Sequence, residues 1–529
     1  MNEPSHNMYS KVTDSSQWTR VSPIAIIYFF FKTLFFLINN VLLFMLPLVA
    51  FNFATIKENF SSVLVGATGL IFIILIASCI KYFFYRYRLG KDKVEIRQGM
   101  IKKSHLDLPF VKIQNIRIIQ PFYYRLSDYS IVELDTAGSS QQEANIVAIR
   151  MPIAESFKRK VQGTPHTVNT NSQVESSEID SSTSLAEKLT NDEILLNRRS
   201  IKDLIIHGIT NNRIWIFLGF LAPLYRSISE NVNIALTYVG FDINAYLSAE
   251  NQSVLMVVLH LISIVLIIML IVVIFSVLGS IFIFFNYTLC RQGKRYIRRS
   301  GLFTRHEVSM QVSRIQRVVQ QQDWLDVLIG RANLSFEQNA SGPATGNQAA
   351  QINTTSKLLV PSITPAEADE LSKDVFAIGK LSDMPYQRVS RRLILRLMIF
   401  PSILTLMVFI PLLFSATDKV MIIASALGTT TLFLGLTSLR WYRWGFASDN
   451  KHLYVRKGFF GQDYIAFPIA KIQQTGFTQT PFMRAKQLAS LHLVLASGGI
   501  YIPYLKQHIV HSVIDSSLTL VARDKPAWM

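Results

Sequence analysis

The sequence repeats one pattern three times, and this repetition constrains the possible folds more than any other feature. Each copy contains a glycine two residues after an arginine, and the three glycines are Gly99, Gly301 and Gly458. A basic–Ile–Gln triplet follows at one fixed distance in every copy, and a second glutamine lies seven residues beyond its isoleucine. Recurrence at several fixed offsets within one chain predicts three copies of the same structural unit.

Each copy contains a stretch in which apolar residues occupy every second position. In the first copy these residues are Leu106, Leu108 and Phe110, and the other two copies alternate at the same place. A period of two indicates a β-strand with one buried face. Further alternating strands and small-residue turns follow, and then a polar segment, clearest at Pro361–Phe376, that we expect to be helical. Each copy should therefore form a small antiparallel β domain, a sandwich or barrel, with a C-terminal helix.

Long apolar runs between the repeats predict membrane-spanning helices, since about 20 apolar residues cross a bilayer. Only 17% of the 529 residues are charged, whereas about 25% is typical of soluble domains. Six candidate runs form three pairs: Thr33–Phe53, Val63–Phe84, Ile214–Leu224, Val254–Phe285, Leu397–Phe414 and Val420–Leu439. The third run is short, and the sequence leaves open whether Ile214–Leu224 spans fully.

The distribution of lysine and arginine predicts the orientation of these runs. The formal net charge is +18, and basic clusters flank the pairs of runs, whereas the connectors inside the pairs hold few basic residues. Because basic flanks stay on the cytoplasmic side of a membrane, we expect both termini and all β domains in the cytoplasm. The predicted location is therefore the cell (inner) membrane, crossed several times.

These observations divide the chain into eight segments. A cytoplasmic N-terminal segment is predicted at residues 1–32, and a disordered linker rich in Ser, Thr, Asn and Glu at residues 161–197. The transmembrane hairpins are predicted at residues 33–84, 198–285 and 381–439. The β domains are predicted at residues 85–160, 286–380 and 440–529.

The hairpin followed by this spaced motif resembles a known family. In the first copy the motif continues with Gln120-Pro121-Phe122 and Arg125-Leu126, and the whole resembles bacterial pleckstrin-homology-like (PH-like) membrane proteins of the YdbS/YdbT type. Three hairpin-plus-domain units resemble the longer, three-repeat YdbT-like form. The second copy departs from the motif, with Asp323-Trp324 in place of Pro-Phe. The resemblance implies PH-like domains, each of two packed antiparallel sheets closed by a helix, and implies little chemistry because this fold hosts many functions.

Sequence patterns that mark many enzymes and metal centres are missing. The chain contains no GxxxxGK[ST], HExxH, CxxC or GxSxG sequence. We therefore predict no catalytic residue, no cofactor and no metal ligand.

The recurrent cations are the sharpest candidates for a binding site. They lie two residues before each glycine or begin each Ile–Gln triplet, and they are Arg97, Lys112, Arg299, Arg314, Arg456 and Lys471. Next to a membrane such cations could contact anionic headgroups, at about 1 kcal/mol each, or a protein partner. In the alternative interpretation they only face water or complete the positive-inside anchoring.

The predicted function is a non-enzymatic inner-membrane scaffold whose three cytoplasmic PH-like domains bind a protein partner or lipid headgroups. The expected partners are membrane lipids and either a second membrane subunit or another copy of the chain. Nucleic acid is not expected, because the positive charge gathers at helix ends and not along a face with interleaved aromatic residues. The alternative function is a transport or export component linked to envelope stress or antimicrobial resistance, which six spans and His260 inside the fourth run would allow.

Overall fold

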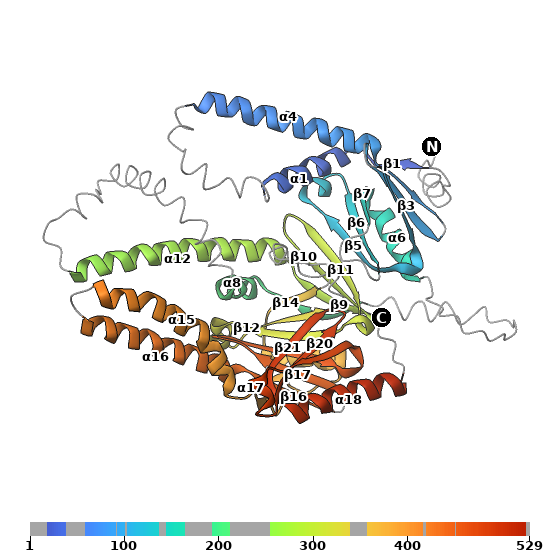
Figure 1. Cartoon of the computed structure of the whole chain (residues 1–529). Helices are drawn as coiled ribbons and strands as arrows, with labels where there is room; N and C mark the ends of the chain where they lie inside the picture. Colours follow the sequence, from blue (N-terminus) through green and yellow to red (C-terminus); the bar gives the residue numbers. More distant parts are fainter. Residues whose placement is uncertain are drawn as a thin grey trace, which may run out of the picture.

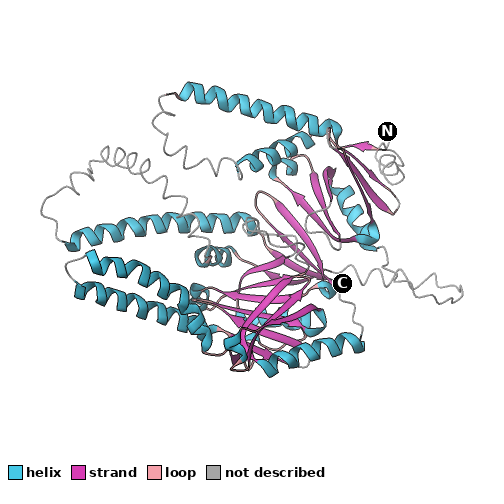
Figure 2. Cartoon of the chain, viewed as in Figure 1, coloured by secondary structure: helices cyan, strands magenta, loops and turns pink. Residues whose placement is uncertain are grey.

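The structure is a computed structural model that describes most of the chain. The described residues are 18–38, 59–90, 92–100, 103–136, 144–163, 193–211, 254–338, 357–415, 419–449 and 451–524. Within these residues, long helices extend from a group of antiparallel β-sheets (Figures 1 and 2).

Three units of the same build follow one another, each with four strands, then three strands, then a closing helix. Unit 1 consists of β1 (Thr19–Arg20), β2 (Arg86–Leu89), β3 (Lys93–Gln98), β4 (Ser104–Pro109), β5 (Ile113–Gln120), β6 (Tyr129–Thr136), β7 (Ala144–Arg150) and α6 (Met151–Gly163). Unit 2 consists of β8 (Ile194–Arg198), β9 (Thr288–Gln292), β10 (Arg295–Ser300), β11 (Arg305–Gln311), β12 (Arg317–Gln322), β13 (Ala332–Glu337), β14 (Lys357–Ile363) and α14 (Pro365–Phe376). Unit 3 consists of β15 (Gln387–Arg388), β16 (Gly445–Ser448), β17 (His452–Lys457), β18 (Gln462–Pro468), β19 (Ile472–Thr478), β20 (Leu488–Leu495), β21 (Gly498–Lys506) and α18 (Gln507–Asp524). The expected fold, two antiparallel sheets closed by a C-terminal helix, is confirmed in each copy.

The repeat extends to unusual backbone conformations. The last strand of each unit contains a residue with positive φ, and these are Ala148, Ser362 and Tyr504, at 53°, 44° and 50°. Each of these residues lies where the register between the last two strands shifts. A left-handed conformation is unfavourable for residues other than glycine, so its recurrence at one place in three sequences marks a shared β-bulge.

Each unit has its own hydrophobic core, formed where its two sheets and closing helix meet. Large aromatic side chains fill these cores, and Tyr124, Phe336 and Phe467 are completely buried in units 1, 2 and 3. The alternation read from the sequence placed the core face correctly, because Leu108 and Phe110 of unit 1 are also buried.

Three helices in the described part of the chain are long and apolar enough to cross a membrane. They are α4 (Phe60–Phe84), α15 (Arg392–Ser415) and α16 (Lys419–Arg443), and they coincide with the second, fifth and sixth predicted runs. A further helix, α12 (Val254–Phe284), coincides with the fourth run. Helix α1 (Ala25–Leu37) contains only the start of the first run, and the rest of that run and the whole third run lie outside the described residues.

The long helices carry exposed apolar side chains, as lipid-facing helices require. Phe72, Leu406 and Leu427 illustrate this on α4, α15 and α16. Figure 1 shows α4, α12, α15 and α16 extending from the β units toward the same side. The three units therefore share one end of the helical assembly, as a membrane protein with all its β domains on one side requires.

The units begin before their hairpins and not after them, which the predicted segments missed. Strands β1, β8 and β15 precede the membrane helices and pair with β2, β9 and β16, which follow those helices. The segmentation was thus wrong for parts of residues 1–32, 161–197 and 381–439, which hold strands of these domains. Strands β1 and β15 have only two residues each, and β8 reads Ile-Leu-Leu-Asn-Arg without alternation, so a period of two could not reveal them.

A helix that the sequence analysis did not predict links the second unit to its hairpin. Helix α8 (Ile201–Thr210) begins with a capping box, in which the side chains of Ser200 and Asp203 bond to each other's backbone N–H groups. It packs tightly on α12, because the hydroxyl groups of Ser276 and Ser280 donate hydrogen bonds to carbonyl oxygens of α8, at 2.7 and 2.8 Å.

Candidate functional site

The three units are joined edge to edge by β-sheet pairing, which the sequence analysis did not predict. Strand β5 of unit 1 pairs antiparallel with β11 of unit 2, and β12 of unit 2 pairs antiparallel with β18 of unit 3. Each joint fuses two sheets into one sheet of seven strands, in the orders β7-β6-β5-β11-β10-β9-β8 and β14-β13-β12-β18-β17-β16-β15. Figure 1 shows the labelled strands β5, β10 and β11 side by side. The units are therefore one continuous row of β structure.

The two joints have the same register. In the first joint Gln120 lies opposite Arg305, and in the second Gln322 lies opposite Gln462. Each of these glutamines is 21 residues after the repeat glycine of its unit, and each opposing residue is four residues after the next repeat glycine. The recurrent second glutamine therefore marks the strand end at which neighbouring units meet.

Side-chain contacts reinforce the first joint. Lys158 on the closing helix of unit 1 forms an ion pair with Glu307 on β11 of unit 2. Arg299 Nε donates to the same carboxylate at 2.9 Å, and its two Nη atoms contact Glu193 at 2.6 and 2.8 Å. Burial alone would raise the pKa of Glu307, but Lys158 and Arg299 outweigh it and lower that pKa. The carboxylate of Glu307 is therefore charged and connects the two units.

The arginine of the motif in unit 1 also crosses the first joint. Arg125 lies in the short helix α5 (Phe122–Arg125), and its Nη1 donates a hydrogen bond to the carbonyl oxygen of Leu302 at 2.7 Å. Leu302 follows the repeat glycine Gly301 of unit 2. The motif thus contributes to the contact between units.

Close backbone packing characterises the second joint. A Cβ atom on Gly461 would lie 2.2 Å from the carbonyl oxygen of Gln322 in the neighbouring unit, so only glycine fits there. Val319 of β12 is buried and belongs to the core of unit 3. Lys471 Nζ donates a hydrogen bond back to the carbonyl oxygen of Ser313 at 2.8 Å.

Charged side chains are buried at the first joint. Arg117 of β5 is 4% exposed and contacts Glu133 at 3.2 Å. Burial lowers the pKa of Arg298 on β10. Burial first, and then the charges of Arg298 and Arg117, lower the pKa of His306 to about 4. The imidazole of His306 is therefore neutral at neutral pH, beside two arginines.

The six predicted cations do not form a single site. Arg97, Arg299 and Arg456 occupy equivalent positions on β3, β10 and β17. Arg97 lies over the ring of Trp18, 4.0 Å from its centroid, and Arg456 lies 5.1 Å from the centroid of Tyr386. Within units 1 and 3 these two arginines are thus held by aromatic rings, whereas Arg299 belongs to the first joint.

The other three cations lie in the short 3-10 turns that connect the two sheets of each unit. These turns are η2 (Phe110–Lys112), η4 (Val312–Arg314) and η6 (Ile469–Lys471). Lys112 is exposed. Burial lowers the pKa of Arg314, helped by the charge of Arg295, and burial also lowers the pKa of Lys471, which crosses the second joint. Binding of headgroups or a partner by these cations stays a prediction, and Arg97 and Lys112 are its most accessible members.

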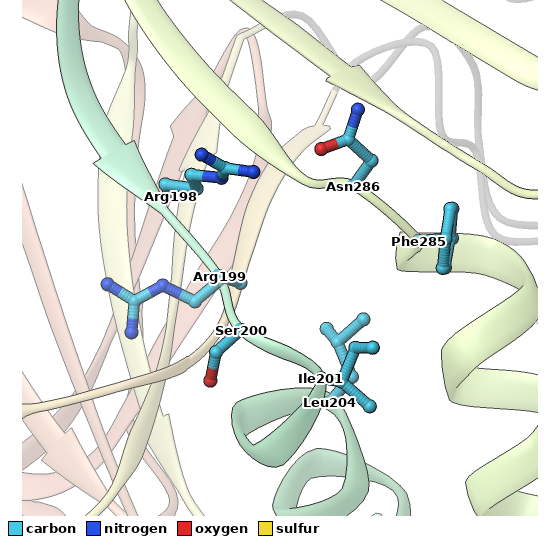
Figure 3. A pocket seen from close by; sticks show the side chains of 7 residues that line it. All are labelled: Arg198, Arg199, Ser200, Ile201, Leu204, Phe285 and Asn286. Carbon is cyan, nitrogen blue, oxygen red and sulfur yellow. The ribbon is translucent and has the colours of Figure 1, made fainter.

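A cavity of about 440 Å³ lies where the second hairpin leaves its unit. Its lining comes from the end of β8, the start of α8 and the end of α12, and the residues are Arg198, Arg199, Ser200, Ile201, Leu204, Phe285 and Asn286. Figure 3 shows the Arg198 side chain directed toward the space beside Asn286, whereas the Arg199 side chain points away. Arg199 is committed elsewhere, to Glu367 at 3.0 Å and Asn197 at 2.6 Å. The cavity thus combines one exposed cation with apolar walls.

Comparison with known proteins assigns these units to a family. A family model described as bacterial PH domain matches residues 35–164, 236–374 and 398–519, which together are more than half of the chain. The chain belongs to the bacterial PH domain family. It is also 21% identical over 495 residues to the UPF0699 transmembrane protein YdbT of Bacillus subtilis (strain 168), a match that covers 92% of this chain and 94% of that protein. The resemblance read from the repeat motif is thereby confirmed.

The sequence did contain a signal for the joints between bacterial PH units. Residues 116–119 read Ile-Arg-Ile-Ile and residues 317–319 read Arg-Val-Val, so β5 and β12 have apolar residues on both faces. Apolar residues on both faces indicate a strand that is covered on both faces, whereas exposed edge strands commonly carry charged residues or proline. The corresponding strand of unit 3 reads Gln-Gln-Thr-Gly-Phe-Thr at residues 473–478, which is mostly polar.

Proposed function

We propose that the protein is a non-enzymatic scaffold of the inner membrane, in which three cytoplasmic bacterial PH units form one rigid row beneath the bilayer. The continuous β pairing across both joints is the observation that carries this proposal. A flexible string of domains would need no such register, whereas two joints of identical register hold the units in a fixed order and spacing. The row can then present several binding surfaces at once, close to the ends of the membrane helices.

Anionic lipid headgroups are the ligands that the exposed cations favour. Arg97 of unit 1 is exposed and lies opposite Arg86, two residues after the end of α4, and Arg198 faces the cavity at the foot of the second hairpin. The formal net charge of +18 adds a general attraction to anionic membranes. A protein partner would bind to the sheet edges and helix faces of this row that the joints leave uncovered.

Native mass spectrometry of the full chain, released from membranes in mild detergent, tests the scaffold. We expect retained anionic lipid, a retained protein subunit, or both. The double variant R97Q/R198Q should retain less anionic lipid, because both removed charges lie near the ends of membrane helices, Arg97 opposite Arg86 after α4 and Arg198 opposite Thr288 after α12. The variant K373Q/K380Q removes the same charge from exposed positions on α14 and just after it, and serves as the matched control. A chain that never carries lipid or a subunit would contradict the proposal.

A further inference from the structure

The row of units ends in two strand edges that have no partner in the described part of the chain. In every unit the fourth strand and the fifth strand meet at the 3-10 turn. In unit 2 both of these strands pair with neighbouring units, through β11 and β12. Among the described strands, β5 of unit 1 is paired outward but β4 pairs only with β3, and β18 of unit 3 is paired outward but β19 pairs only with β20. Unit 1 therefore ends the row with its fourth strand and unit 3 ends it with its fifth strand, and these are the two kinds of strand that pair at each internal joint.

Burial shows that these two edges are the joint surfaces in an uncovered state. Val319 and Gln320 of β12 are buried, whereas the corresponding Gly476 of β19 is half-buried and Phe477 is 45% exposed. The same contrast holds for the other edge. Tyr464 of β18 is buried, whereas the corresponding His105 of β4 is exposed. The residues of β4 and β19 are thus more exposed than the equivalent residues of β18 and β12, which a neighbouring strand covers at the second joint.

The sequence of β19 carries none of the usual protection of an exposed edge. Natural edge strands are commonly blocked by charged residues or proline, because an open edge recruits other strands. Residues 472–478 read Ile-Gln-Gln-Thr-Gly-Phe-Thr and contain neither. The strand is therefore suited to being covered by another strand.

We propose that β19 of one copy pairs antiparallel with β4 of a second copy of this chain, in the register of the two internal joints. Applying that register places Gln479 opposite Lys103, Thr478 opposite Ser104 and Phe477 opposite His105. No pair of like charges results, and Pro109 and Pro481 both lie outside the paired stretch. The pairing deepens the proposed scaffold and rests on it, because it extends the same row from one chain to the next.

The membrane helices restrict where such pairing can occur. The long helices of all three units extend to the same side (Figure 1), so pairing in the register of the internal joints keeps the units of the second copy at the same membrane surface. Because the contact is head-to-tail, it can join more than two copies.

Disulfide cross-linking between two differently tagged copies tests the pairing. One full-length copy carries S104C and the other T478C, both at exposed positions and both in a C79A background. The remaining thiol, Cys290, is buried, and burial raises its pKa, so it reacts slowly. After co-expression and mild oxidation in native membranes, we expect a disulfide-linked product that carries both tags.

A shifted pair provides the matched control. Copies with S104C and Q474C also expose their thiols, but in the proposed register the two positions are displaced by four residues, roughly 13 Å, too far for a disulfide. We expect at least tenfold less product from this pair than from S104C with T478C. Equal yields from both pairs would overturn the register.

Three further results would overturn the inference. The first is no mixed product, which would leave the edge to a different protein. The second is linkage of S104C copies to each other, which would indicate symmetric pairing of β4 with β4. The third is linkage only when S104C and T478C are in one chain, which would place the contact within a single copy. A separate variant, Q321C/D463C, should form a disulfide within one chain across the second joint, and if it does while the mixed product is absent, the row stands and only the pairing between copies fails.

Discussion

Replacing Gly461 with alanine should open the joint between units 2 and 3. The added Cβ would lie 2.2 Å from the carbonyl oxygen of Gln322 and 2.9 Å from the Cα of Asp323, whereas real Cβ contacts are essentially never shorter than 3.0 Å. Both neighbours are backbone atoms, so no flexible side chain can move aside. The strands must separate by about 1 Å, beyond the tolerance of a hydrogen bond.

The expected cost follows from the hydrogen bonds at that end of the joint. Gln322 pairs with Gln462, and Gln321 pairs with Asp463. Loss of one or two backbone hydrogen bonds, at about 0.5–1.5 kcal/mol each, would destabilise the joint by about 0.5–3 kcal/mol. If the amides exchange through local opening, their hydrogen exchange becomes roughly 2- to 150-fold faster.

Hydrogen–deuterium exchange of the full chain, read by mass spectrometry, measures this directly. Peptides from β12 and β18 should exchange faster in G461A, and peptides from β13 and β14 should not change. The control G379A adds a methyl group between the same two units where its nearest neighbour is the end of Met384, at an ordinary 3.6 Å, and should behave like the natural protein. Unchanged exchange of β12 and β18 in G461A would refute the packing at this joint.

Three other predictions concern the first joint and the second hairpin. The folded chain lowers the pKa of His306 from its ordinary 6.5 to about 4, so at pH values between these two the unfolded state binds a proton that the folded state does not. The free energy of unfolding should therefore keep its full value above pH 6.5 and decrease by up to about 3 kcal/mol as the pH falls to 4. Acid unfolding of H306Q should lack this pH dependence. E307Q removes the carboxylate that connects the units and should speed hydrogen exchange of β5 and β11 at pH 7 by roughly tenfold or more, with an unchanged rate as the contrary result. G208V places a Cβ 2.5 Å from the Cα of Val277 and should lower the thermal stability in detergent, whereas G279A, with nothing within 4 Å of its added Cβ, should not; equal effects would contradict the packing of α8 on α12.

Local patterns in the sequence predicted the units but not their connections. The alternation of Leu106, Leu108 and Phe110 identified β4 correctly, since one face of that strand is buried. The apolar runs identified α4, α15 and α16, because length and composition alone define a membrane span. In contrast, β1 and β15 contain only two residues each, and no periodicity exists at that length.

The candidate site was less predictable because its contacts join distant parts of the chain. Arg299 was singled out as a recurrent cation, but its partner Glu193 lies 106 residues away. Nothing in the sequence distinguishes a paired arginine from one that awaits a ligand. The joints depend on strands from different units, and only the apolar faces of β5 and β12 hinted at them.

Cysteine labelling tests the central claim, that three units on one side of the membrane form a single row. Single cysteines at Gln98, Lys294 and Lys457, exposed positions in units 1, 2 and 3, would be introduced into the C79A chain and treated with a membrane-impermeant maleimide. We predict that none of the three is labelled in intact cells and that all three are labelled once the inner membrane is made permeable. Labelling of any one of them from the opposite side to the others would contradict the account, because strands paired across both joints cannot lie on two sides of a bilayer.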